Sequence, residues 1–190
     1  TGFQKFWNNI GKVANKGFEF ELRTMNIDKE KFSWKSSFNI SFNKNELLDL
    51  AGEVRQINYG ERQESYLAEV GKPSIQYYLF KTTGVWKSDE EVANNPHHTN
   101  DKAGGLRVWD ANDDGEITDA DRVTCGTPFP DFTWGFTNSF NVYGFDISVM
   151  LQGSQGGKVF NGDGYYNETW KFNKMFKDTN YWISPDHPGN

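Results

Sequence analysis

Hydrophobic and polar side chains alternate strictly over residues 32–42. Aromatic or aliphatic side chains occupy the even positions apart from Ser36, and Ser, Lys or Asn occupies each odd position. A period of two predicts a β-strand with one apolar and one polar face. With its flanking polar residues the pattern spans roughly 35 to 40 Å at about 3.3 Å per residue, which is longer than the strands usual in soluble domains.

Three further stretches alternate in the same way. Residues 18–22 do so, and a short link joins them to residues 32–42, which predicts a β-hairpin. Residues 132–142 also alternate, and the phase reverses after Tyr143–Gly144 into residues 145–151. A glycine at a two-residue phase break is a signal for a tight turn. The chain therefore predicts two long antiparallel hairpins.

The connections between these strands are very unequal in length. Short links join the members of each hairpin, whereas residues 44–130 separate the two hairpins. Outer-membrane barrels combine short periplasmic turns with long extracellular loops, while a soluble sandwich shows turn signals every 8 to 12 residues or so. If the strand before the excursion rises through a membrane and the one after it descends, the stretch between crosses an even number of times, and we expect none. The pattern predicts an extracellular excursion over residues 44–130, with a soluble sandwich as the alternative.

Composition narrows the class of protein. The chain has 190 residues, a formal net charge of −6 and 16% aromatic residues. Because no cluster of Lys or Arg forms a basic stripe, we do not expect it to bind nucleic acid. No apolar run approaches the roughly 20 residues of a transmembrane helix, and a single cysteine, Cys125, excludes an internal disulfide. The chain starts in mid-pattern without Met, so we expect a fragment or a processed product.

An acidic loop over residues 110–121 is the candidate metal site. It reads DANDDGEITDAD and fits the calcium-loop pattern D-x-[DN]-x-[DN]-G. In such a loop alternate side chains converge on one point, the Gly permits a sharp turn, and position 7 offers its backbone carbonyl. Hard oxygen donors favour Ca²⁺ over a transition metal. We predict a structural Ca²⁺ with the ligands Asp110, Asn112, Asp114, Glu116 and Asp121.

This loop departs from a calcium sensor in two ways. Asp121 stands where an EF-hand carries a bidentate Glu, and no amphipathic helix precedes the loop. A solvated acidic turn is the simpler alternative, because acidic runs are usually solvated. No Ser/His/Asp or Cys/His set appears along the chain, so we do not expect an enzyme.

The charged residues of the first hairpin lie on its polar face. In a barrel this face would line the lumen, where the side chains either border a substrate path or only hydrate the wall and pair across strands. The second interpretation is the simpler one. The residues concerned are Glu19, Glu21, Arg23, Lys31 and Lys35.

Several long blocks of the chain resemble one family. The blocks NNIGKVANKGFEFEL, FSWKSSFNISFNKNELLDL, YYLFKTTGVWKSDEE, VWDANDDGEITDADRVTCGTPFPDFTWGFTNSF and FDISVMLQGSQGGKVFNG follow one another as in SusC/RagA-type TonB-linked outer-membrane proteins of Bacteroidetes. The resemblance covers nearly the whole chain. It implies an all-β fold for residues 1–190: an antiparallel transmembrane β-barrel segment from the C-terminal half of a barrel of about 22 strands, with long extracellular loops.

The resemblance also implies a function and partners. Members of this family import oligosaccharides or oligopeptides across the Gram-negative outer membrane together with a SusD-like surface lipoprotein. TonB–ExbB–ExbD drives the import and would act through an N-terminal part that this sequence does not contain. The family often carries an acidic loop like residues 110–121 in an extracellular segment. The alternative from another class is a secreted, soluble, calcium-stabilised β-domain that binds carbohydrate.

Overall fold

The computed structural model describes residues 11–50, 56–59, 65–162, 180 and 182–187. These residues fall into two compact units. The first is built on residues up to Gln76 together with residues 126–159, and the second on residues 77–125 with residues 160–190. Each unit has its own strands and its own buried side chains, so each is described by itself.

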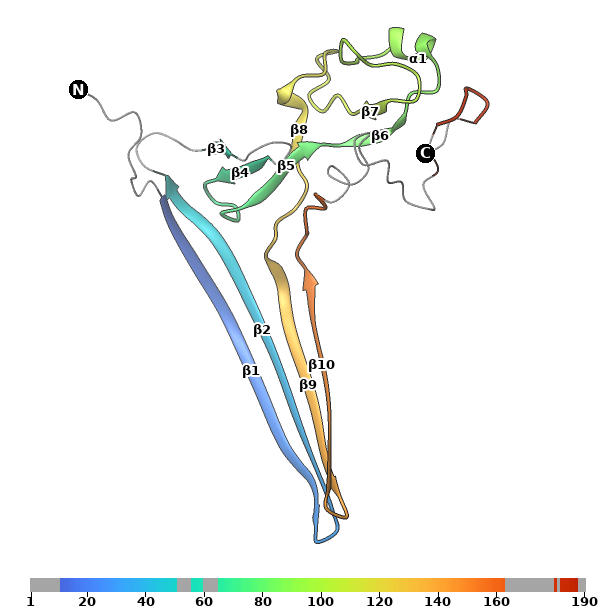
Figure 1. The fold of residues 1–190 in the computed structure, drawn as a ribbon. Coiled ribbons are helices and arrows are strands. Elements are labelled where there is room, and N and C mark those ends of the chain that lie inside the picture. The colour runs from blue at the N-terminus through green and yellow to red at the C-terminus, as the bar shows by residue number, and fades with distance from the viewer. Residues whose placement is uncertain (1–10, 51–55, 60–64, 163–179, 181, 188–190) are drawn as a thin grey trace, which may run out of the picture. The chain divides into compact units, whose positions relative to one another are not determined.

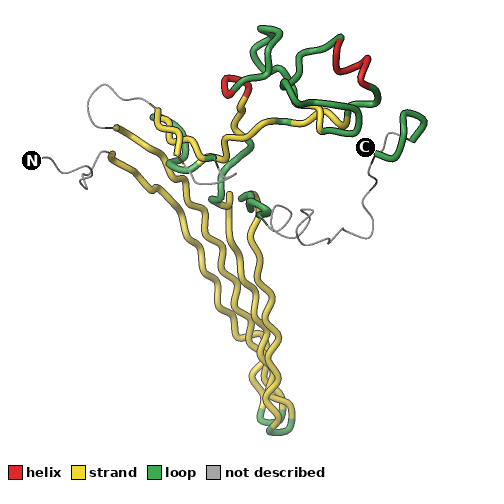
Figure 2. Tube along the Cα trace, turned by 45° about the horizontal axis from the view of Figure 1, so that its top comes forward, coloured by secondary structure: helices red, strands yellow, loops and turns green. Residues whose placement is uncertain are grey.

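Four long strands form one antiparallel sheet in the first unit (Figure 1). They are β1 (Gly11–Lys29), β2 (Phe32–Leu50), β9 (Pro130–Val142) and β10 (Phe145–Gly156), and they lie in the order β1-β2-β9-β10. Figure 2 shows them running side by side as continuous strands. The structure therefore confirms both predicted hairpins, and it adds that β2 pairs with β9, so residues before and after the long excursion are direct neighbours.

Both hairpins turn tightly at the same end of the sheet (Figure 1). In the β9–β10 turn Tyr143 and Gly144 have φ values of 51° and 88°. Positive φ at both central residues is the geometry that suits the twist of paired strands. The backbone N–H of Tyr143 donates to the carbonyl of Lys31, 2.9 Å away, so the two turns are hydrogen-bonded to each other.

Register brings the alternating apolar side chains of all four strands onto one face. Leu22 lies opposite Phe38, Phe38 opposite Phe136, and Phe136 opposite Leu151. Further rows repeat this arrangement along the sheet: Phe20–Ile40–Trp134–Gly153, Ile27–Trp34–Phe140–Ile147 and Lys29–Phe32–Val142–Phe145. Because the side-chain period is two, a slip of one residue would move every ring to the polar face. The register is therefore fixed by the pattern itself.

Nothing among the described residues covers this apolar face. Phe18 is 64% exposed and Phe145 is 75% exposed, and Leu22, Ile147 and Leu151 are also exposed. A soluble sandwich would bury these side chains against a second sheet. Among the described residues this sheet has one layer, like a slice of a barrel wall, and not the two packed layers of the sandwich alternative.

The buried core of the first unit lies at the end of β2 away from its tight turn. Leu47, Leu50 and Leu67 are buried, and Leu47 exchanges backbone hydrogen bonds with Gly71 and Lys72. The strands β3 (Gln56–Tyr59) and β4 (Tyr66–Glu69) pair antiparallel beside this core. Packing here extends β2 to Leu50, eight residues beyond the predicted alternation, so the strand reaches into the predicted excursion.

The second unit is built from short strands and one short helix. It contains the paired strands β5 (Gln76–Phe80) and β8 (Arg122–Thr124), the paired strands β6 (Thr82–Val85) and β7 (Leu106–Val108), the helix α1 (Asp89–Ala93) and a 3-10 turn over Asp119–Asp121. Its fully buried ring is Trp86, which is 1% exposed and donates from Nε1 to Oδ2 of Asp101 at 3.2 Å. β5 and β6 are separate short strands, because the pairing partner changes at Lys81 from β8 to β7.

No helix within the described ranges combines the length and the apolar character needed to cross a membrane.

Candidate functional site

The acidic loop leads from Asp110 directly into β8. Its backbone reverses at Asp113 and Gly115, which have φ values of 57° and 86°. Only a small set of residues adopts positive φ at low cost, and Gly and Asp are among them. The sequence therefore folds this segment into a compact turn, in which Ile117 is buried.

Three side chains at alternate positions hold the backbone of the turn. Oδ2 of Asp110 accepts from the N–H of Gly115 at 2.9 Å. Oδ1 of Asn112 accepts from the N–H of Asp114 at 3.0 Å, and Oδ1 of Asp114 accepts from the N–H of Glu116 at 2.9 Å. Short polar side chains commonly bond the backbone a few residues on in this way. The loop is thus organised by its own acidic residues.

Asp121 closes the loop from its far end and is completely buried. Its Oδ2 accepts from the N–H of Thr118 at 2.7 Å, and its Oδ1 accepts from the N–H of Ala111 at 2.9 Å. The hydrogen bond from Thr118 is the main cause that lowers the pKa of Asp121 below its ordinary value, against the opposing effect of burial. Asp121 is therefore held ionised beside Asp110.

One buried oxygen of this loop has no hydrogen-bond partner among the described residues. It is Oδ1 of Asp110, whose other oxygen binds Gly115. An unsatisfied buried carboxylate oxygen is costly unless a cation or donor meets it. This atom, next to the Asp121 carboxylate, is the feature of the loop that fits a bound cation best.

The remaining predicted ligands are less well placed. Asn112, Asp114 and Glu116 are exposed, and Nδ2 of Asn112 donates to Oδ2 of Asp114 at 2.7 Å. In the part of the chain that the structure describes, no three His, Cys, Asp or Glu side chains are grouped closely enough to hold a metal ion. Calcium also accepts amide and backbone carbonyl oxygens. The residues are therefore compatible with Ca²⁺ through Asp110 and Asp121, with the other positions completing the set as amide or carbonyl donors.

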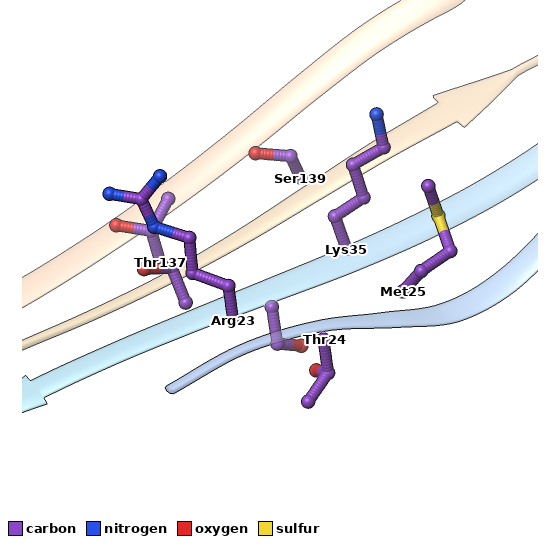
Figure 3. Close-up of a pocket in the computed structure, with 8 residues that line it drawn as sticks. Arg23, Thr24, Met25, Lys35, Thr137 and Ser139 are labelled. Atoms are coloured by element: carbon purple, nitrogen blue, oxygen red, sulfur yellow. The ribbon is translucent and has the colours of Figure 1, made fainter. Parts of the chain in front are cut away.

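The polar face of the long sheet carries the predicted charged residues. Nε of Arg23 binds Oε1 of Glu21 at 2.6 Å, and Oγ of Ser41 donates to Oε1 of Glu19 at 3.3 Å. Arg23 and Lys35 border a shallow hollow on this face (Figure 3). Arg23 thus pairs within β1, the bond between Ser41 and Glu19 crosses from β2 to β1, and Lys35 has no carboxylate within 4.0 Å among the described residues.

The opposite, apolar face carries a small polar cluster that the sequence pattern did not identify. Oδ1 of Asn138 accepts from Nε1 of Trp34 at 2.9 Å and from Oγ of Ser36 at 2.7 Å. Nδ2 of Asn26 donates to Oγ of Ser36 at 2.7 Å, and Asn26 lies at an irregularity of the β1–β2 register. Two signals in the sequence were Ser36 and Asn138, polar residues that each interrupt the alternation of their stretch. Cross-strand hydrogen bonds thus satisfy the polar atoms of this row.

The chain is similar to parts of known receptors. It is 34% identical over 99% of its length to "TonB-dependent receptor P26" of Formosa agariphila, and 32% identical over 95% of its length to "TonB-dependent receptor P3" of the same organism. It is 25% identical over 80% of its length to "TonB-dependent receptor SusC" of Bacteroides thetaiotaomicron. No protein-family model matches the chain.

Solved structures show the same fold. The RagAB peptide importer in its 'closed-closed' state aligns with this chain at a TM-score of 0.62 and 17% identity. The alignment covers 84% of this chain and 17% of the importer chain. The structure of the RagAB peptide transporter aligns with this chain at a TM-score of 0.56. The alignment covers 76% of this chain and 15% of the transporter chain. The chain spans about a fifth of the length of the curated relatives it matches, 19% for each of the first two.

Proposed function

The chain is a homologue of the SusC-type TonB-dependent receptors, which are outer-membrane proteins of Bacteroidetes, and we propose that it forms part of the barrel wall of a nutrient importer. A sheet with one polar and one uncovered apolar face suits such a wall, because lipid covers the apolar side and the lumen wets the other. The observation that carries this proposal is the set of aligned apolar rows on one face of β1, β2, β9 and β10.

The size of the apolar band supports the proposal. The apolar face of β2 runs from Phe32 to Phe42, which is ten residue steps or about 33 Å along the strand. In a barrel whose strands tilt by about 35 to 45°, that length corresponds to a height of about 23 to 27 Å. The lipid-facing band of such barrels is about 25 Å tall. One strand is therefore long enough to cross the membrane once.

Topology supports an orientation for the wall. The tight turns of both hairpins lie at one end of the sheet, and the chain leaves β2 and enters β9 at the other end. Periplasmic turns of bacterial barrels are short and extracellular loops are long. We therefore place the two tight turns in the periplasm and the excursion over residues 44–130 on the cell surface.

We base the proposed cargo and partners on the names of the similar proteins. The RagAB neighbours are named a peptide transporter and a peptide importer, and the curated relatives are named TonB-dependent receptors. We assign this receptor the import of oligosaccharides or oligopeptides with a SusD-like surface lipoprotein, driven by TonB–ExbB–ExbD. We assign it no catalytic step.

We also propose that the acidic loop holds a structural Ca²⁺. Asp110 and Asp121 would bind it through carboxylate oxygens, and Asn112, Asp114 and the backbone carbonyl of Glu116 would complete an oxygen set of the kind Ca²⁺ prefers. The unpaired buried Oδ1 of Asp110 supports this assignment. Two neighbouring carboxylates repel each other, so a cation between them would stabilise the loop.

Deletion of the receptor that contains this segment tests the import function. The deletion strain should lose growth on one class of oligomer, either oligosaccharides or oligopeptides, and keep growth on the corresponding monomers. Restoring the intact receptor in the outer membrane should restore growth. Unchanged growth on every oligomer tested, with the receptor shown to be expressed in the parent strain, would contradict the proposal.

A further inference from the structure

An open hollow of about 370 Å³ lies on the polar face of the long sheet. Figure 3 shows Arg23 and Met25 of β1, Lys35 of β2, and Thr137 and Ser139 of β9 around it. The residues at its base alternate with those of the apolar rows, so the hollow faces away from the side that we assign to lipid. It therefore faces the lumen of the proposed barrel.

The charge in this hollow is positive and incompletely balanced. Arg23 is bound to Glu21 at 2.6 Å. Lys35 lies opposite Met25 on one side and Ser139 on the other, and neither neighbour is acidic. No described carboxylate lies within 4.0 Å of the Lys35 ammonium group. One cation of the hollow thus has its charge available to a ligand.

Hydroxyl groups surround this cation. Ser37 and Thr137 lie opposite each other across β2 and β9, and Ser139 makes only a 3.4 Å contact between its Oγ and Oγ of Ser148. On the other face of the same strands, Ser36 and Asn138 bind each other. An ammonium group is a donor only, and a hydroxyl rotates to donate. The hollow therefore offers the Lys35 ammonium group and several hydroxyl donors to an incoming group, and its hydroxyl oxygens can also accept.

We propose that this hollow binds an oxyanion, a carboxylate or a sulfate, carried by the solute that passes through the lumen. The inference rests on the proposed import function and names the chemical class of the solute at this point of the wall. Lys35 supplies the charge, and Ser37, Thr137 and Ser139 donate hydrogen bonds. Charge-assisted hydrogen bonds to carboxylate or sulfate are stronger than neutral ones.

The position of the hollow fits a contact close to the exit of the lumen. Lys35 stands four residues after the turn residue Lys31, or about 13 Å along the strand. With the tight turns in the periplasm, the solute would meet Lys35 late in its passage. A shallow, solvated site binds weakly, which suits a contact that a moving solute has to leave.

The test uses the intact receptor in detergent micelles, with its lysines reductively methylated with ¹³C for NMR. The Lys35 signal is assigned by its absence in Lys35→Arg. Sodium glucuronate and sodium sulfate are titrated against sodium chloride at equal ionic strength, with glucose as the neutral control. We expect a saturable shift of the Lys35 signal with glucuronate or sulfate, no shift with glucose, and no shift of the exposed Lys87 signal.

The response to salt distinguishes an oxyanion of the solute from an acidic side chain of the receptor. If an acidic side chain of the receptor itself occupies the hollow, the Lys35 signal will move when salt is raised but will not respond to glucuronate beyond the chloride control. That result would overturn the proposal, because the protein and not the solute would supply the oxyanion. A Lys35 signal that behaves like Lys87 in all titrations would overturn the proposal.

Uptake measurements distinguish a failure of the oxyanion site from a failure of the proposed import function. Lys35→Gln should reduce uptake of an acidic oligomer more than uptake of a neutral one, whereas Lys35→Arg should retain both and Lys87→Gln should change neither. Equal loss of acidic and neutral cargo in Lys35→Gln would overturn the anion site. Import by the unmodified receptor would stand in that case, because it does not depend on this test.

Discussion

Trp34 donates from its indole Nε1 to Oδ1 of Asn138 at 2.9 Å, and this hydrogen bond joins β2 to β9 on the apolar face of the sheet. The two residues are 104 positions apart in the chain. The bond lies within the band that we assign to hydrocarbon, where an unsatisfied polar group costs several kcal/mol. It therefore ties the two hairpins together and keeps a polar row tolerable on the lipid side.

Replacing the shared acceptor should destabilise the wall. Asn138→Ala leaves Nε1 of Trp34 without its acceptor and removes the acceptor of the Ser36 hydroxyl, which keeps only the hydrogen bond from Asn26. We expect the free energy of unfolding to fall by about 1 to 3 kcal/mol, measured by urea titration of the receptor in micelles. Asn141→Ala, which removes the hydrogen bond to Asp146 on the polar face, should cost less.

A combined variant tests whether unsatisfied polar groups cause the loss of stability in Asn138→Ala. In Asn26→Ala/Trp34→Phe/Ser36→Ala/Asn138→Leu all four polar groups of the cluster are gone, and removing both partners of a hydrogen bond is often nearly neutral. We expect this variant to be more stable than Asn138→Ala. A combined variant that is the less stable of the two would show that the hydrogen bonds are not the cause.

Two adjacent residues of β2 provide a test of which face meets lipid. Phe38 lies in an apolar row, and Ser37 lies on the polar face. Arg on the lipid face near the middle of the bilayer costs about 2 to 4 kcal/mol, whereas substitutions facing the lumen cost far less. Phe38→Arg should therefore prevent or weaken assembly in liposomes by that amount, and Ser37→Arg should assemble normally. Equal effects of the two variants would contradict the assignment of faces.

Calcium should stabilise the acidic loop through Asp110. Asp110→Asn keeps an oxygen for the N–H of Gly115 but removes the charge beside Asp121. We expect added Ca²⁺ to protect residues 110–121 from proteolysis in the unmodified receptor, EDTA to reverse the protection, and Asp110→Asn to weaken Ca²⁺ binding at least tenfold, or about 1.4 kcal/mol.

The matched control is Asp113→Asn in the same loop. It removes one negative charge from a residue that is not a proposed ligand, and Asn also tolerates the positive φ of this position. Calcium titration of both variants by calorimetry separates a specific ligand from general charge. If the unmodified receptor takes up no Ca²⁺, or if both variants lose it equally, the metal site is wrong.

Acid should open the loop through Asp121. The pKa of Asp121 is lowered in the folded state from an ordinary value of 3.8, chiefly by the hydrogen bond from the Thr118 N–H. Its contribution to stability is therefore present above about pH 4 and is lost as the pH falls through the lower folded pKa. Proteolysis of the loop with an acid-active protease, in EDTA, should rise over that range in the unmodified receptor.

Asp121→Asn serves as the control for this titration, because its side chain does not ionise. Its proteolysis should be faster above pH 4 and should change little with acid. Parallel acid curves for the two proteins would mean that another carboxyl group controls the loop.

The strands could be predicted from the sequence because their information is local. Over residues 32–42 and 132–151 the apolar period fixes both the strand and the face, and the Tyr143–Gly144 phase break marks the turn. The end of β2 at Leu50 could not be predicted, because packing of Leu47 and Leu50 stabilises that end of the strand without alternation. Tertiary contacts decide such ends, and local pattern does not.

The candidate sites could likewise be predicted where the information is local, and not where it depends on tertiary contacts. Loop spacing predicted that the ends of residues 110–121 meet, and Asp110 and Asp121 do lie in contact. Spacing did not predict that Asp121 binds two backbone N–H groups. The partners of Trp34 and Lys35 depend on β2 lying beside β9, and this pairing closes about ninety residues of chain that carry no local signal of it.

Site-directed spin labelling of residues 37 and 38 in a receptor that carries Cys125→Ser, so that the exposed native thiol takes up no label, tests the central claim most directly in lipid vesicles. If the aligned rings face hydrocarbon, a label at Phe38→Cys should relax strongly with oxygen, which concentrates in lipid, and weakly with a water-soluble nickel complex. A label at Ser37→Cys should not show that preference for oxygen. Equal or reversed accessibility at the two positions would contradict the account of this sheet as a membrane wall.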